Sequence, residues 1–255
     1  MISQITQIAK IETLLANLKT TRFNALLPVT IDVLKQSAKN EYQLQIGTKE
    51  ITTKTQKELE VGSKYWGVMK EDPEINTLTL SKLLKKPKFL QMQRSNFLPE
   101  FTEAKLAELI SKENPKVELK ALLQEKLSLA ANKNEFMTLT NMISALNENV
   151  FTLVLKDGNQ NTMFQFKKRK KAEGSSSEDA QVDFYAAFEH LGPVEGVVSV
   201  VKDQRKVSLS LFYQESLEFL ANELEYLDIE GFLYKKDKQI EPLYELSTSL
   251  LDLRG

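Results

Sequence analysis

Glycine is distributed unevenly along this chain, and this distribution constrains the fold more than any other feature of the sequence. The chain has nine glycines, and none of them lies between Val68 and Asp157. Glycine collects at tight turns because it adopts positive φ angles at no steric cost. A long stretch without glycine, between two stretches that contain it, therefore predicts β-rich modules on either side of a helical segment.

The first of these modules lies at Asn24–Lys70, where apolar and polar residues alternate as they do in short strands. Leu26–Leu34 and Glu41–Ile46 both alternate, and the residues around Gly47 have the composition of a hairpin turn. Further strand residues are Ile51, Thr53, Leu59, Val61, Tyr65, Trp66 and Val68. Because several short strands must curl to bury one face, we expect residues 1–75 to form a small β-barrel-like module.

The middle of the chain, residues 76–148, changes to a helical period in which apolar residues recur three, four and seven positions apart. These residues are Leu80, Leu83, Leu84, Leu106, Leu109, Ile110, Leu119, Leu122, Leu123, Leu127, Leu139, Met142, Ile143 and Leu146. Pro87, Pro99 and Pro115 interrupt the stretch, because proline lacks an N–H donor and clashes inside a helix. We therefore expect several short helices rather than a single long one.

Residues 149–255 return to strand patterns. Asp157-Gly158 predicts a hairpin turn into a strand at Met163–Phe166, and a strand at Val182–Phe188 leads to a second hairpin at Val197–Phe212. The fold class predicted for the whole chain is α+β. Its C-terminal module combines a hairpin with one packed helix.

The helix expected after the second hairpin has an apolar face. This face consists of Leu217, Leu220, Leu224 and Leu227. Gly231 stands where the C-cap of this helix is expected. Phe232–Tyr234 and Leu243–Leu253 are candidates for closing strands, and Ile2–Leu18 has the pattern of a weakly amphipathic helix.

Charge and composition argue against several classes of function. Lys and Arg total 34 against 35 Asp and Glu, so the chain lacks the charge that would attract nucleic acid or an anionic membrane. There is no cysteine and a single histidine, His190, which excludes thiolate and His-rich metal sites and argues against a Ser-His-Asp triad. We expect no metal, no cofactor and no enzymatic activity.

The sequence also predicts a cytoplasmic protein without membrane insertion. Met1–Lys10 has neither the basic start nor the continuous apolar stretch of a signal peptide. No run approaches the roughly 20 apolar residues that cross a bilayer.

Three polar segments are candidate sites, and each has a plainer interpretation. The basic run Lys167–Lys171 could bind phosphate, but the acidic residues beside it favour a solvated loop that continues through Ala172–Ala180. His190 is expected in a turn, without the partners that a general base needs. The helix Glu215–Asp228 carries carboxylates opposite its leucines, and these form either a solvated face or an acidic docking surface for a basic partner.

In Phe184–Tyr234, an alternating strand is followed by a turn, a hairpin, an amphipathic helix and a glycine. This order resembles the C-terminal domain of flagellar hook-length control proteins. The matching residues are Leu191, Gly192 and Pro193 in the turn, Leu209 and Leu211 in the hairpin, and Leu217, Leu220, Leu224 and Gly231 in the helix region. Leu27-Pro28, Gly47, Leu59 and Gly62 are similar to the upstream region of shorter proteins of this kind.

The resemblance implies a regulatory protein rather than an enzyme. Members of this family act at the flagellar type III export apparatus, where the C-terminal domain engages the cytoplasmic domain of the export-gate membrane protein and switches export from hook to filament substrates. The residues expected to contact this partner are Leu191, Gly192, Pro193, Val194, Val198, Val200, Leu209 and Leu211.

The family usually carries a long Gln/Pro-rich segment that serves as a ruler, whereas this chain has a patterned helical middle. A folded chain reaches far less than an extended one, so a short paralogue that tunes the export gate is expected rather than a ruler. Whether the protein is itself exported stays open. The alternative hypothesis is a generic protein adaptor with no flagellar role, and a small-molecule enzyme is a third that lacks a catalytic constellation.

Overall fold

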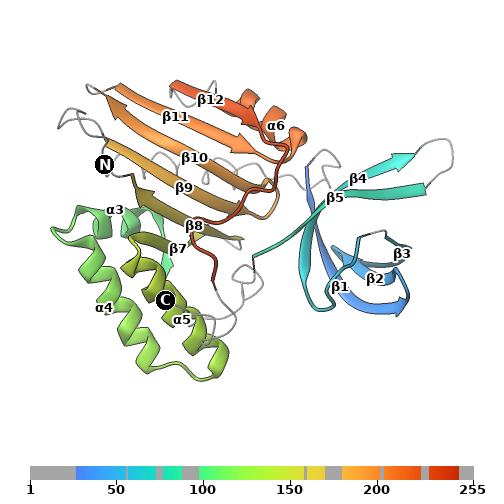
Figure 1. The fold of residues 1–255 in the computed structure, drawn as a ribbon, viewed down its shortest axis with the longest axis horizontal. Helices are drawn as coiled ribbons and strands as arrows, with labels where there is room; N and C mark the ends of the chain where they lie inside the picture. The colour runs from blue at the N-terminus through green and yellow to red at the C-terminus, as the bar shows by residue number, and fades with distance from the viewer. Residues whose placement is uncertain are drawn as a thin grey trace.

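The described part of the chain folds into two β-sheets and a set of helices (Figure 1). The computed structural model describes residues 27–55, 57–72, 77–87, 98–157, 160–169, 180–201, 204–224 and 230–246. Strands predominate within these residues, and the expected α+β class is confirmed. The helix expected at Ile2–Leu18 lies outside the described part of the chain.

The smaller sheet is antiparallel and has the strand order β3-β2-β1-β4-β5. Its strands are β1 (Val29–Ala38), β2 (Glu41–Ile46), β3 (Lys49–Lys54), β4 (Lys64–Asp72) and β5 (Thr77–Lys85). The first two turns are tight because Asn40 and Gly47 adopt positive φ angles of 61° and 60°. Local alternation and turn residues therefore predicted β1 to β4 well.

Alternating apolar side chains build a core on one face of this sheet. The fully buried members are Val29, Ile31, Val33, Tyr42, Leu44, Ile46, Leu59 and Tyr65. The hydroxyls of Tyr42 and Tyr65 accept the backbone N–H groups of Leu59 and Glu60, at 3.3 and 2.9 Å, which holds the loop before β4 against the core. Strands β3 and β5 are the two ends of the sheet and do not pair, so the barrel-like closure that we expected is not seen among the described strands.

Residues 77–85 were expected to begin the helical segment, and they form the strand β5 instead. Leu80 and Leu83 both pack on the core of the smaller sheet although they lie three positions apart. A β-bulge explains this spacing, because the β4–β5 register shifts between Trp66 and Val68 and Lys82 takes a positive φ of 52°. The extra residue moves the side chains that follow it to the other face. A strand thus acquires the spacing of a helix, which is why the prediction was wrong here.

Three helices follow, as expected for the middle of the chain. They are α3 (Glu103–Ser111), α4 (Pro115–Ser128) and α5 (Lys133–Asn147). Pro115 is the first residue of α4, where its missing N–H costs no intrahelical bond. The side-chain oxygens of Thr102 and Asn132 cap α3 and α5 by accepting N–H groups of the first turn. The buried helix residues that join the larger hydrophobic core are Leu106, Leu119, Leu123, Leu139, Met142 and Leu146.

The larger sheet has the strand order β12-β11-β10-β9-β8-β7-β6. Its strands are β6 (Glu100–Phe101), β7 (Val150–Asp157), β8 (Gln160–Lys168), β9 (Ala180–Phe188), β10 (Gly192–Val201), β11 (Gln204–Leu211) and β12 (Glu230–Lys235). Neighbours are antiparallel except at the two ends, where β6 is parallel to β7 and β12 is parallel to β11. Parallel neighbours need a crossover. Helices α3 to α5 supply the first one, and α6 (Gln214–Leu224) supplies the second.

Two expectations for the end of the chain need correction. Gly231 is not a helix C-cap, because it lies in β12 and pairs with Val207 of β11. The closing strand at Phe232–Tyr234 is confirmed, but residues 243–246 are not in a strand. Tyr244 instead exchanges two backbone hydrogen bonds with the side chain of Gln165, at 2.8 and 3.1 Å. Residues 236–246 therefore form a strap that crosses in front of the larger sheet (Figure 1).

Candidate partner-binding surface

The residues expected to contact a partner lie in the core of the protein and not on its surface. Leu191, Gly192, Pro193, Val194, Val198, Leu209 and Leu211 are all buried, and the side chain of Val200 lies outside the described residues. Buried side chains cannot touch a partner, so this assignment is corrected. The alternation of apolar residues correctly predicted the hairpin. These apolar residues, however, lie on the face of β10 and β11 that is turned toward the core of the protein.

The opposite face of the hairpin is open to solvent in part. The side chains of Glu195, Val197 and Ser199 on β10 alternate with the buried ones, and so do Ser208 and Ser210 on β11. Successive residues of a strand point to opposite faces, so these five residues share one side of the sheet. A partner of this region would meet that side.

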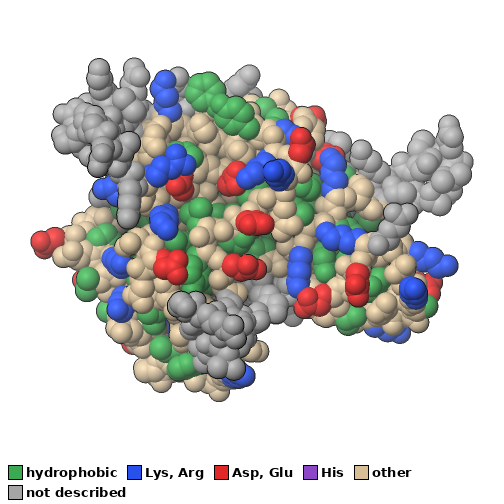
Figure 2. Space-filling model, viewed as in Figure 1, with side chains coloured by type: hydrophobic (Ala, Val, Ile, Leu, Met, Phe, Trp, Pro, Cys, Tyr) green, Lys and Arg blue, Asp and Glu red, His purple; other side chains and the backbone are tan. Residues whose placement is uncertain are grey.

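Strand β12 extends the same face with two aromatic residues. Phe232 is the register partner of Ser208, and Tyr234 is the partner of Ser210. Their exposed fractions are 45% and 53%. Figure 2 shows apolar side chains gathered at the upper end of this face, over β12. We call Phe232 and Tyr234 the β12 aromatic pair.

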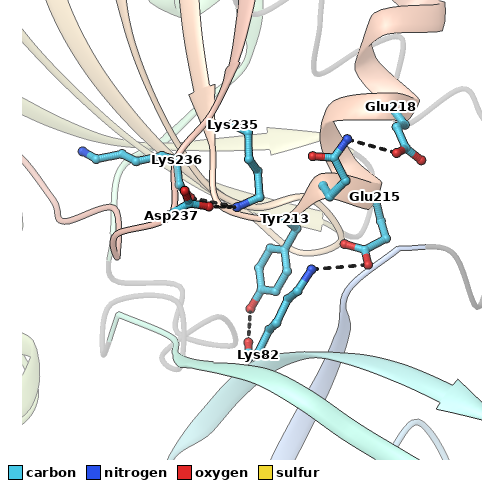
Figure 3. A network of polar contacts seen from close by, with 8 residues as sticks. Lys82, Tyr213, Glu215, Glu218, Lys235, Lys236 and Asp237 are labelled. Carbon is cyan, nitrogen blue, oxygen red and sulfur yellow. Dashed lines mark hydrogen bonds and ion pairs between the residues drawn. The ribbon is translucent and has the colours of Figure 1, made fainter.

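Charged side chains surround the C-terminal end of β12. Lys236 lies 2.6 Å from Glu195, Lys235 lies 3.2 Å from Asp237, and the Lys235 ammonium sits 5.4 Å from the centre of the Phe212 ring. Figure 3 shows Lys235, Lys236 and Asp237 together at this end of the strand. The β12 aromatic pair is therefore bordered by acidic and basic side chains that pair with one another. Protein interfaces commonly have such a polar rim around an apolar centre.

A second cluster joins the start of α6 to the smaller sheet. The Tyr213 hydroxyl donates to the backbone carbonyl of Lys82 at 3.0 Å, and the Lys82 ammonium lies 3.6 Å from Glu215 (Figure 3). Lys82 is the bulge residue of β5, so the hydroxyl of Tyr213 binds the backbone at the bulge. Burial and the nearby Glu215 raise the pKa of the Tyr213 hydroxyl, which keeps the donor proton in place.

The ring of Tyr213 also explains the glycine of the predicted turn. Gly192 has a positive φ of 77°, and a Cβ atom there would lie 2.5 Å from Cε2 of Tyr213. A side chain at this position would therefore displace the tyrosine. Glycine is needed at this position so that the Tyr213 ring can pack against the start of β10.

A third cluster holds the two sheets together at the end of β9. The indole N–H of Trp66 donates to the carbonyl of Phe188 at 2.9 Å. The buried Lys86 ammonium lies 2.9 Å from Glu189, donates to the Thr30 hydroxyl at 2.6 Å, and sits over the Trp66 ring. Burial lowers the pKa of Lys86, although the neighbouring carboxylate opposes this shift.

His190 matches its plainer interpretation, but the solvated loop expected from Lys167 begins later, because β8 continues through Lys168. His190 is exposed in the turn between β9 and β10. Lys167 and Lys168 belong to β8, and Arg169 pairs with Asp183 at 2.7 Å, whereas residues 170–179 lie outside the description.

The expected acidic helix face is only partly available. Glu215 is directed to Lys82, and Glu218 is exposed and accepts from Gln214 at 3.0 Å. Glu223 lies within α6, but its side chain is not described. The acidic residues after Leu224 lie outside the described residues.

Sequence reasoning missed the β12 aromatic pair and the buried Lys86. An alternating triplet such as Phe232–Tyr234 predicts a strand, but it does not tell which face of the strand the rest of the chain covers. Lys86 stands in the run Lys85-Lys86-Pro87-Lys88, which carries no signal of burial. Trp66 comes near Lys86 through the pairing of β4 with β5, whereas Glu189 comes near it only because the two sheets pack against each other.

Neither metal-binding clusters of His, Cys, Asp and Glu nor helices able to span a membrane occur in the part of the chain that the structure describes. Comparison with family models, with curated proteins and with solved structures finds no match to this chain.

Proposed function

We propose that this protein is a non-enzymatic regulator of flagellar type III export, similar to hook-length control proteins, and that it binds the cytoplasmic domain of the export-gate membrane protein. The observation that carries the proposal is the β12 aromatic pair, which lies exposed at the end of the segment that resembles the family. The elements expected for that segment occur in the expected order. The strand is β9, the turn lies before β10, the hairpin is β10 with β11, and the helix is α6.

The aromatic pair supports a binding role on physical grounds. Tyrosine and phenylalanine supply large contact areas at a small cost in side-chain entropy, and such residues often dominate the binding energy of an interface. Isolated apolar residues on a surface are ordinary, but here two aromatic side chains lie two positions apart on one strand face. A generic adaptor that binds a different protein through this surface is the alternative, and the same surface supports it.

Binding of the full chain to the purified export-gate domain tests the proposal by titration calorimetry. We expect the wild-type chain to bind, and we expect Phe232→Ser and Tyr234→Ser each to weaken binding by about tenfold or more. The matched control is Phe136→Ser, because Phe136 is exposed to a similar extent, 44%, but lies on α5.

Each outcome bears on a different part of the proposal. Absence of binding by the wild-type chain contradicts the flagellar role and favours the adaptor. Binding that survives both substitutions on β12 contradicts the assignment of the surface. In cells, the same two variants are expected to alter hook length or the switch to filament export, whereas Phe136→Ser is expected to leave both unchanged.

A further inference from the structure

The outer edge of β12 has no strand partner among the described residues, because β12 is the last strand in the order of the larger sheet. An unpaired edge presents a row of N–H and C=O groups that can pair with another strand. Natural edge strands are often blunted by charged residues or prolines. In β12, only the first and last residues, Glu230 and Lys235, are charged, and there is no proline.

One hydrogen bond shows which backbone N–H and C=O groups of β12 point to its outer edge. The N–H of Lys236 points inward and donates to the carbonyl of Leu211 at 2.8 Å. In a parallel pair, the backbone groups of alternate residues point to alternate sides. The N–H and C=O groups of Gly231, Leu233 and Lys235 therefore point to the outer edge.

These three residues define an antiparallel register with a second copy of the same strand. With Leu233 at the two-fold axis, Leu233 pairs with itself and Gly231 pairs with Lys235 of the second copy. Phe232 then lies opposite Tyr234 of the second copy, once on each side of the axis. These positions are the non-hydrogen-bonded ones, where opposite side chains approach most closely and aromatic pairs stabilise a sheet.

The charges fit this register as well. Lys235 faces a glycine, and position 230, an acid in the sequence, falls opposite Lys236 of the second copy. No like charges are opposed. A register centred on Phe232 pairs the two phenylalanines but leaves both tyrosines opposite position 230, so it forms fewer aromatic pairs.

We propose that β12 pairs antiparallel with β12 of a second copy of this chain, joining the two larger sheets into one continuous sheet. The pairing uses the edge of β12, so the aromatic residues of both copies lie side by side on one face. The inference uses the strand that carries the proposed partner surface, but it does not depend on the identity of that partner.

Sedimentation velocity of the full chain, from micromolar to submillimolar concentration, tests this pairing. We expect the mass to rise with concentration from the 29.1 kDa of one chain to twice that value. Lys235→Pro removes an N–H that points to the outer edge, away from β11, and proline is tolerated at such edge positions. We expect this variant to stay monomeric and Lys235→Ala, which loses the same side chain but keeps the N–H, to dimerise.

Phe232→Ser gives an independent measure, and we expect it to weaken dimerisation by about tenfold. Circular dichroism and thermal melting of each variant check that the fold is kept. A wild-type chain that remains monomeric at every concentration overturns the inference, and so does a Lys235→Pro variant that dimerises as well as Lys235→Ala. If the chain is monomeric but binds the export-gate domain through Phe232, the inference fails while the proposed function stands.

Discussion

Individual residues at the junction of the two sheets carry much of what is specific to this fold. Gly192 leaves room for the Tyr213 ring, and the bulge at Lys82 offers that tyrosine a carbonyl. Trp66 and Lys86 reach the end of β9, where they meet Phe188 and Glu189. Each contact joins residues far apart in the chain, so each can be tested by a single substitution.

Replacing Gly192 by alanine should destabilise the protein by about 3 kcal/mol, because the new methyl group adds overlap with Tyr213 to the strain of a positive φ. Gly62→Ala is the matched control. Gly62 also has a positive φ, 80°, but a Cβ there meets no atom within 4 Å. The control should cost only about 1 kcal/mol. Urea unfolding measures both, and equal losses would contradict the packing role of Gly192.

Lys86→Met should lower the free energy of unfolding by about 2 kcal/mol at neutral pH, because Glu189 and Thr30 lose their buried donor. Since burial lowers the pKa of Lys86 in the folded protein, the unfolded chain binds more protons between this lowered pKa and the ordinary value of 10.5. The stability of the wild type relative to Lys86→Met should therefore rise with pH across this window.

Unfolding by urea at several pH values measures this difference. The exposed Lys168 of β8 provides the control, and Lys168→Met should change the free energy of unfolding by less than about 0.5 kcal/mol. A difference that falls as the pH rises would contradict a Lys86 pKa that is lowered by burial.

At the level of elements, local signals predicted most strands and all three middle helices, and they failed where pairing decided the outcome. Tight turns, alternation and capping residues are properties of neighbouring residues, so they can be seen in the sequence. The bulge in β5 depends on how that strand pairs with β4, and it made Leu80 and Leu83 look helical. The burial of the expected contact residues depends on which face of the hairpin the core covers.

The strap at 236–246 is an element without regular structure, and it is held by burial of Ile240 and by the bonds to Gln165. Ile240→Ala should cost about 3 kcal/mol of stability, because it leaves a cavity beneath the strap. Gln239→Ala, at the exposed neighbouring position, should cost less than about 0.5 kcal/mol. Chemical denaturation measures both variants, and a small loss for Ile240→Ala would mean that the strap does not seal the sheet.

At the scale of the whole molecule, the two sheets share a hydrophobic core. Trp66, Val68 and Leu84 come from the smaller sheet, yet they belong to the cluster that fills the larger one. A shared core couples the unfolding of its parts, because neither sheet can separate without exposing apolar area to water.

The chain should therefore unfold in a single cooperative transition. Trp66 is the only tryptophan and lies buried at the junction, so its fluorescence reports on the contact between the sheets. Circular dichroism reports on the strands and helices of the whole chain. We expect the two signals to change at the same urea concentration, and a fluorescence change that precedes the loss of ellipticity would show that the sheets separate first.

The sequence by itself determined the periodic elements of this protein: where alternation runs, where turns are tight and where helices start. These features follow from backbone geometry and from side chains only a few positions apart. Only the tertiary structure decided that Val194, Val198, Leu209 and Leu211 of the hairpin face inward, that Phe232 and Tyr234 face solvent, and that Lys86 is buried. Those outcomes depend on which surfaces the packed sheets cover, and that is a property of residues distant in the sequence.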